Sequence, residues 1–251
     1  MMRITETVKH LIIINVIFYI GSLVVGTRAD DILALHFPLN SDFKVWQPIT
    51  YMFMHDRTNF LHILFNMVGL WMFGSALETY WGPKKFIFFY ISCGLGAAAL
   101  HVGIDFYSFN KAMEIVEATG LTREQILNAL NTQDFSIFNG KIDQSTFNMF
   151  AGNFYSPMLG ASGALYGIMV AFAFMFPDVG LMLLFFPIPI KAKYFVPGLL
   201  AFDLYKGLKG QGLFGSGGDG IAHFAHLGGA ILGFIMMWYW KKNQYNGNRW
   251  N

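Results

Sequence analysis

Long apolar segments separated by short polar ones make up most of the chain. A helix that crosses a bilayer needs about 20 mostly apolar residues, so each of the longest apolar segments is a candidate transmembrane helix. Five such segments are 11–25, 60–81, 85–105, 158–176 and 221–240. The first could also be a signal peptide. Because no clear small-residue cleavage site follows it, we interpret it as an uncleaved helix.

One further span is harder to place, because the apolar sequence between the last two segments is interrupted. Residues 179–190 and 194–205 are both apolar, and Lys191 and Lys193 lie between them. A helix of about 12 residues is roughly 18 Å long, well short of a hydrocarbon core of about 30 Å. We therefore assign the first piece to a proline-rich interfacial segment. The second, extended to about Leu208, becomes the fifth span, and it has Asp203 near its outer end.

The charged residues predict the orientation of such a six-span protein, whose two termini lie on one side of the membrane. Lysine and arginine concentrate on the cytoplasmic side of membrane proteins. The predicted inner segments hold only the acids Glu6, Glu78 and Asp178, against the bases Arg3, Lys9, Lys84, Lys85, Lys191, Lys193, Lys241, Lys242 and Arg249. We therefore expect both termini in the cytoplasm. The chain shows no extra targeting region, which leads us to expect a prokaryotic inner membrane.

Residues 106–157 form the one long polar stretch, and this topology places it outside the cytoplasm, between the third and fourth spans. Thr122-Arg-Glu-Gln125 has the pattern of a capping box that opens a short helix, with Ile126, Leu127 and Leu130 on one face. A connection this long is more often folded than bare loop. The chain is thus expected to form a single membrane domain, 1–251, that carries a small folded insert.

Composition supports an all-α membrane protein. Hydrophobic residues make up 55% of the chain and charged residues 13%, whereas soluble domains carry roughly 25% charged residues. The single cysteine, Cys93, excludes a disulfide scaffold and a cysteine metal cluster. A net charge of +2 gives no footprint for nucleic acid.

Polar residues are costly inside a bilayer and are therefore candidates for function. Three groups lie near the starts of the second, fourth and sixth spans, which all run from outside to inside and so hold them at similar depth. They are His62-x-x-x-Asn66, Gly160-Ala-Ser162-Gly163 and His223-x-x-His226-Leu-Gly-Gly229. A serine hydroxyl becomes a nucleophile when a neutral histidine takes its proton. Acyl transfer also needs hydrogen-bond donors for the oxyanion.

The spacing of these groups fits that chemistry. His62 and Asn66, four residues apart, share one helix face, and the backbone N–H of Ser162 is a further donor. Gly163-x-x-x-Gly167 and Gly229-x-x-x-Gly233 are small-residue pairs that allow two membrane helices to approach closely. A hydrogen bond between Ser162 and His226 requires such an approach.

Together these groups resemble the rhomboid intramembrane serine proteases. The matching residues are Gly160-Ala-Ser162-Gly163, Tyr166, Ala225-His226-Leu-Gly-Gly229, His62-x-x-x-Asn66 and Gly74-Ser-Ala-Leu-Glu78. The six-span order also matches, over about residues 8–242. Trp46-Gln47 stands where many members carry Trp-Arg in the first outer loop.

The resemblance implies a Ser–His dyad without an acid. Ser162 would be the nucleophile and His226 the base, with Tyr166 packed on the imidazole to orient it. His62, Asn66 and the Ser162 N–H would form the oxyanion hole. Gly160, Gly163 and Gly229 would support the site. The substrate would be a transmembrane segment cut near the outer face, and neither cofactor nor metal would be required.

Two alternatives stay open. A rhomboid-like pseudoprotease would bind client helices without cutting them, and a small-solute transporter would show repeats and charges near the midplane. The histidines His55, His62, His223 and His226 have no acid spaced with them, which argues against zinc. We expect Glu78 to make a structural pair. His223 could line a water path or hydrogen-bond a loop, and we favour the loop. The role of His55 and the oligomeric state are left open.

Overall fold

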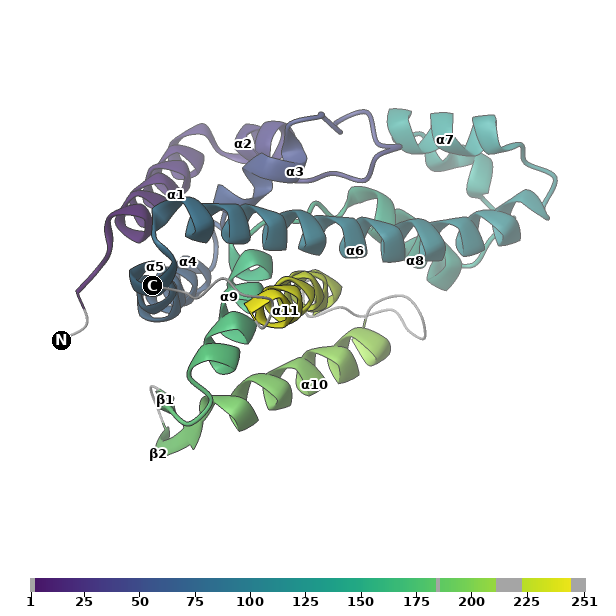
Figure 1. Cartoon of the computed structure of the whole chain (residues 1–251). Helices are drawn as coiled ribbons and strands as arrows, with labels where there is room; N and C mark the ends of the chain where they lie inside the picture. The colour runs from purple at the N-terminus through teal and green to yellow at the C-terminus, as the bar shows by residue number, and fades with distance from the viewer. Residues whose placement is uncertain (1–2, 184–185, 211–222, 245–251) are drawn as a thin grey trace.

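The computed structural model describes residues 3–183, 186–210 and 223–244, and most of these residues are helical (Figure 1). The elements in chain order are α1 (Glu6–Val25), α2 (Thr27–Leu33), α3 (Gln47–Thr50), η1 (Tyr51–Phe53), α4 (Phe60–Gly69), η2 (Leu70–Gly74), α5 (Ser75–Trp81), α6 (Pro83–Glu117), α7 (Arg123–Thr132), η3 (Phe135–Phe138), α8 (Gln144–Tyr155), α9 (Ser162–Met175), β1 (Gly180–Leu183), β2 (Phe186–Lys191), α10 (Ala192–Gly210) and α11 (His223–Gln244).

Three helices of the described chain are long and apolar enough to cross a membrane: Glu6–Val25, Phe60–Trp81 and Pro83–Glu117. The second keeps its predicted bounds but contains a π-helical turn, η2, between α4 and α5. The helix α9 is a shorter apolar helix of 14 residues. It begins at Ser162 rather than at 158, because Gly160 takes a left-handed φ of 123° that no helix contains.

The proline-rich segment before α10 is a β-hairpin. Leu181 pairs with Ile190 and Gly180 with Lys191, in antiparallel register. Proline lacks the N–H that a helix interior requires, but an edge strand tolerates it. Beside the hairpin, Lys191 and Lys193 both contact the Asp178 carboxylate, at 3.1 and 2.8 Å. The following helix, α10, is 19 residues long, which gives it about 28 Å of length.

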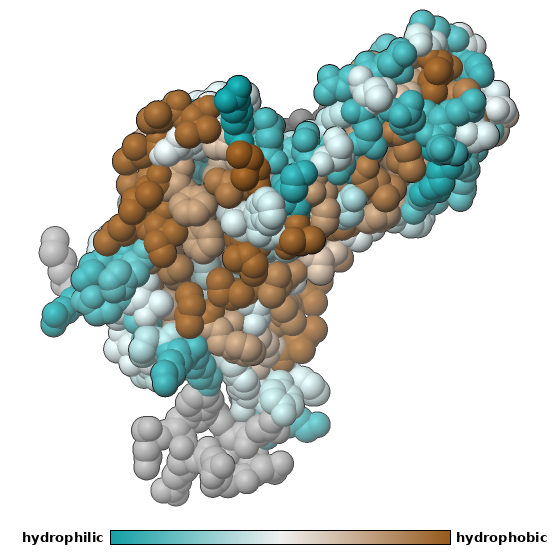
Figure 2. Space-filling model, turned by 90° about the horizontal axis from the view of Figure 1, so that it is seen from above, coloured by the Kyte–Doolittle hydropathy of each residue, from teal (hydrophilic) through white to brown (hydrophobic). Residues whose placement is uncertain are grey.

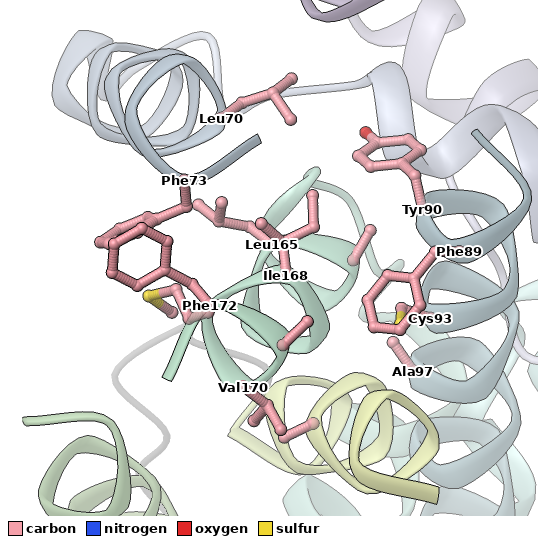
Figure 3. Close-up of a cluster of buried hydrophobic side chains, with 14 of the residues drawn as sticks. Leu70, Phe73, Phe89, Tyr90, Cys93, Ala97, Leu165, Ile168, Val170 and Phe172 are labelled. Carbon is pink, nitrogen blue, oxygen red and sulfur yellow. The ribbon is translucent and has the colours of Figure 1, made fainter. Parts of the chain in front are cut away.

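The largest hydrophobic cluster lies where α9 meets α6 and the η2 turn. Leu70 and Phe73 come from η2, Phe89 and Cys93 from α6, and Leu165 from α9 (Figure 3). This packing holds α9 in the middle of the bundle, between α6, α11 and the α4–α5 segment (Figure 1). The nucleophile predicted at Ser162 therefore sits on a helix most of whose residues are buried.

The third predicted span is only part of a longer helix. We expected it to end near Asp105, but α6 continues to Glu117. Its last turns pack against α7, η3 and α8 around a second hydrophobic cluster with its own buried residues. Figure 2 shows that this projecting lobe is covered mainly by hydrophilic residues, whereas hydrophobic residues cover much of the rest of the visible face.

Within the lobe, the predicted capping box is confirmed. The Thr122 side chain accepts a hydrogen bond from the Gln125 backbone N–H, and the Gln125 side-chain oxygen accepts one from the Thr122 backbone N–H. Ile126 and Leu130 are fully buried, with Leu127 partly buried beside them. The polar sequence 106–157 is thus a folded unit in the described structure.

Candidate active site

Ser162 is the first residue of α9, and the turn before it is held by backbone hydrogen bonds. The Gly160 N–H donates to the Tyr51 carbonyl at 3.0 Å. Met158 and Leu35 exchange two backbone hydrogen bonds of 2.9 Å each. These contacts fix the segment before Ser162 to η1 and to the loop between α2 and α3.

That loop is in turn anchored by Gln47, the residue at the position where many rhomboids carry arginine. Gln47 is fully buried. Its side-chain oxygen accepts from the backbone N–H groups of His36 and Lys44, at 3.2 and 3.0 Å, and its amide nitrogen donates to the Asp42 carbonyl at 2.8 Å. The neutral amide satisfies both donors and acceptors of the loop, so arginine is not needed for anchoring here.

Glycines allow α9 and α11 to meet backbone to backbone. A Cβ atom added to Gly229 would lie 1.8 Å from the Gly163 carbonyl oxygen, and one added to Gly233 would lie 2.8 Å from the Gly167 Cα. No larger residue fits at either contact without moving a helix. The two small-residue pairs seen in the sequence are thus the surfaces by which these helices touch.

This close approach brings Ser162 and His226 into hydrogen-bond contact. The Ser162 Oγ lies 2.9 Å from the His226 Nε2. The Tyr166 ring stacks on the His226 imidazole, with 4.1 Å between centroids and 10° between planes. The imidazole is 9% exposed as a residue, so its orientation is set by protein contacts rather than by water.

The structure adds a residue that the sequence reasoning did not assign to the site. Asp203, on α10, is 2% exposed. Its Oδ1 lies 3.2 Å from the His226 Nδ1 and 2.5 Å from the His223 Nδ1. Two expectations are corrected by these contacts: an acid does lie beside the histidines, and His223 contacts this acid rather than a loop. The acid comes from a different helix, so spacing along the sequence could not find it.

Asp203, His223 and His226 are also the described residues that could hold a metal ion. Their ligand atoms lie within 4.8 Å of one another. The hydrogen bonds among the three side chains account for this grouping without an ion, because both Nδ1 atoms face the same carboxylate oxygen.

His62 faces Ser162 across a small space beside Gly160. A Cβ atom on Gly160 would lie 3.0 Å from the His62 Nε2 and 3.5 Å from the Ser162 Oγ, so the glycine keeps this space open. The Asp56 backbone N–H donates to the His62 Nδ1 at 3.3 Å. Because Nδ1 is the acceptor, neutral His62 carries its proton on Nε2. A donor therefore points into the space next to the serine.

Asn66 is buried one turn below His62, as the four-residue spacing predicts. In this structure its Nδ2 donates to the His62 backbone carbonyl at 2.8 Å. An amide NH₂ group has two donor hydrogens, so this bond leaves one of them for another acceptor.

Two further buried polar residues, Glu78 and His55, do not contact the dyad. Glu78 accepts hydrogen bonds from the Thr7 and Val8 backbone N–H groups, at 3.0 Å each, and so caps the start of α1. This is the structural pairing that we expected. His55, in the loop before α4, is fully buried, and its ring lies edge-on to the His62 ring at 5.1 Å. Burial, and secondarily repulsion that an imidazolium at His62 would exert, lowers the pKa of His55 to about 3, which keeps it neutral.

Comparison with known proteins decides the family. The rhomboid domain matches residues 42–243, which is most of the chain and includes Ser162, His226 and Asp203. The chain belongs to the rhomboid family. This rhomboid is accordingly an integral membrane protein of a family of intramembrane serine proteases, which also contains inactive members.

Curated rhomboids from several organisms are similar to it. Rhomboid protein 1, mitochondrial, of Saccharomyces cerevisiae is 25% identical over 190 residues, which are 76% of this chain and 40% of that protein. RHOMBOID-like protein 12, mitochondrial, of Arabidopsis thaliana is 27% identical over 174 residues, covering 69% and 40%. Rhomboid protease GlpG of Salmonella typhi is 36% identical over 73 residues, covering 29% and 26%. The matches thus span less than half the length of these relatives.

Proposed function

We propose that this rhomboid is an intramembrane serine endopeptidase that cuts transmembrane segments of other proteins. The observation that carries the proposal is the 2.9 Å contact between the Ser162 Oγ and the His226 Nε2. A serine hydroxyl is a poor nucleophile until a base takes its proton, and a neutral imidazole at this distance is such a base. The family's activity gives the reaction its class.

The residues around the dyad supply the remaining steps of acyl transfer. His226 accepts the Ser162 proton as the oxygen attacks the peptide carbonyl, and then gives that proton to the leaving amine. Water hydrolyses the acyl-enzyme by the same route in reverse. The oxyanion would be bound by the Ser162 N–H, the His62 Nε2–H and Asn66, and one such donor is typically worth about 2.7–4 kcal/mol. No step in this sequence needs a cofactor.

The topology of the proposal follows from helix parity and charge. We propose six spans, with α9, α10 and α11 as the last three and the 106–157 lobe outside the cytoplasm between the third and fourth. Both termini would then be cytoplasmic, and the dyad would lie near the outer face, within a single membrane domain. Curated relatives include mitochondrial proteins, so which cellular membrane holds this chain stays a prediction.

The test is covalent labelling with a fluorophosphonate probe, followed by cleavage of a reconstituted transmembrane test substrate. We expect wild type to be labelled and to cut, and Ser162→Ala and His226→Ala to do neither. Ser75→Ala is the matched control, because Ser75 is a fully buried serine on α5, and it should behave as wild type. Folded wild type that is neither labelled nor able to cut would favour the pseudoprotease. Solute flux through liposomes that survives Ser162→Ala would favour the transporter.

A further inference from the structure

Asp203 is an unusual residue for its helix. Most of α10 is exposed at the surface of the bundle, and its buried positions are Ala192, Val196, Asp203 and Gly207. Asp203 is therefore the one ionisable side chain that the described part of α10 buries. A buried carboxylate is costly unless it is paired and hydrogen-bonded, and within a membrane protein it marks function by default.

The contacts of Asp203 place it in line with the dyad. Its Oδ1 lies 3.2 Å from the His226 Nδ1, and the opposite nitrogen of the same ring, Nε2, lies 2.9 Å from the Ser162 Oγ. Carboxylate, imidazole and hydroxyl thus follow one another in the order of a serine-hydrolase triad. The chain of contacts crosses three helices, α10, α11 and α9.

Resting on the proposed protease function, we propose that Asp203 is a positioning residue that converts the Ser–His pair into a triad. It accepts the His226 Nδ1–H, which leaves the Nε2 lone pair directed at the Ser162 hydroxyl. When His226 takes the serine proton, the carboxylate stabilises the imidazolium that forms. Tyr166 stacking alone fixes the plane of the ring but not the nitrogen that carries the proton.

The role of His223 follows from the same oxygen. Its Nδ1 lies 2.5 Å from the Asp203 Oδ1, closer than that of His226. By donating to this oxygen, His223 holds the carboxylate against α11 and helps to offset its burial. The other titratable groups that face this cluster are His101 on α6, which is paired with Asp105 at 3.3 Å, His62 on α4 and Tyr166 on α9.

A purely structural role makes a different prediction. Asp203 could serve only to tie α10 to α11, in which case its contact with His223, the shorter one, would matter most. Losing either partner would then lower thermal stability, and any loss of turnover would follow that loss of stability. The positioning role instead predicts a loss of kcat that stability does not explain.

The experiment is steady-state cleavage of a transmembrane test substrate by the full chain in detergent, with melting temperatures measured in parallel. Asp203→Asn is isosteric and should fold. We expect its kcat to fall by about 10²- to 10⁴-fold, as for loss of a triad carboxylate, with KM within about threefold of wild type. The acidic limb of its pH–rate profile should also move to lower pH, because the imidazolium has lost its counter-charge.

Two variants separate the explanations. Asp178→Asn makes the same chemical change at an exposed acid paired with Lys191 and Lys193, and it should leave kcat unchanged. His223→Gln should keep at least tenfold more of the wild-type kcat than Asp203→Asn does. If Asp203→Asn is unfolded, Asp203→Glu replaces it, since it keeps the charge but displaces it by one methylene and should lower kcat about tenfold or more.

The results that would overturn the positioning role of Asp203 differ from those that would overturn the proposed protease function. The positioning role would be overturned, and the dyad left intact, if wild type is active and the kcat of Asp203→Asn lies within threefold of wild type. The same holds for Asp203→Glu where it replaces the asparagine variant. Equal losses of kcat and melting temperature in Asp203→Asn and His223→Gln would also overturn it, in favour of a helix tie. Inactive, unlabelled wild type would instead overturn the protease function itself.

Discussion

The contact between α9 and α11 in the membrane bundle is packed differently from the helices of the projecting lobe. In the bundle, α9 and α11 meet through glycines, so closely that a Cβ on Gly229 would overlap the Gly163 carbonyl. In the lobe, helices are kept apart by aromatic rings, of which Phe109 and Phe150 stack at 4.9 Å. Figure 2 shows the corresponding difference at the surface, hydrophobic over much of the bundle and hydrophilic over the lobe.

The contrast reflects the two solvents. Lipid is as apolar as a leucine side chain, so helices in a bilayer gain little by burying large residues and associate through close backbone contact and polar bonds. In water, burial of a phenylalanine side chain is strongly favourable, so buried aromatic rings hold the lobe together. One consequence is functional: close helix contact places Ser162, His226 and Asp203 on three helices within hydrogen-bond reach.

The largest effect should come from adding one methyl group to the bundle. Gly229→Ala would place a Cβ 1.8 Å from a backbone oxygen of α9, so α11 must move and carry His226 with it. A misplacement of about 1 Å can cost roughly 10²-fold in rate. We expect fluorophosphonate labelling of Ser162 to fall at least that far, with a lower melting temperature.

The matched control is the same substitution in the lobe. Gly152 lies in α8, is exposed and has no atom within 4 Å of an added Cβ. Gly152→Ala should leave labelling unchanged and stabilise the lobe by about 0.5–1 kcal/mol, through lower chain entropy in the unfolded state. Equal behaviour of the two variants would show that glycine contact is not what distinguishes the bundle.

The next largest effect should come from removing a buried aromatic ring from the lobe. Phe150→Ala removes a fully buried ring that stacks on Phe109, which should cost about 3–5 kcal/mol. We expect limited proteolysis to cut within 106–157, from the outer side of sealed vesicles or cells, while labelling of Ser162 stays within threefold of wild type. Ile115→Ala, at a half-exposed position of the same lobe, should remain resistant. Cutting from the cytoplasmic side would reverse the proposed topology.

Sequence patterns predicted the bundle best where they involved residues close together in the chain, or groups of residues at the same depth in the membrane. The Phe60–Trp81 span, the capping box at Thr122 and the glycine pairs of α9 and α11 all depend on neighbours in the chain. The proline-rich segment before α10 was assigned to the interface without a secondary structure, and its strand pairing was missed because hydropathy carries no information about register between strands. The extension of α6 to Glu117 was missed because only one face of its last turns is apolar, and that face, with Phe109, Met113 and Val116, is buried by the lobe rather than by lipid.

Asp203 shows why the site itself was only partly predictable. Span parity already placed it near the outer end of its helix, at the depth of Ser162 and His226, which is the signal that could have linked them. Depth does not give the rotation of a helix about its own axis, and that rotation decides whether the carboxylate meets lipid or His226. Only the packing of α10 on α11 settles this, and it is invisible in a single sequence.

The smallest predicted effect contrasts the two regions in their response to acid. Burial lowers the pKa of His55 to about 3 from 6.5, the value of an exposed histidine. At pH 5, His55 is therefore protonated in the unfolded chain and neutral in the folded bundle. Stability should therefore fall as the pH drops below 6.5, by up to about 2 kcal/mol at pH 5 from this residue.

In the lobe, hydrogen bonds from Ser136 and Thr146 lower the pKa values of the exposed capping residues Asp134 and Asp143, so these caps stay ionised at pH 5. Thermal melting at pH 7 and pH 5 should show a smaller acid shift in His55→Phe than in wild type, and an identical shift would rule out His55 as a source of acid sensitivity.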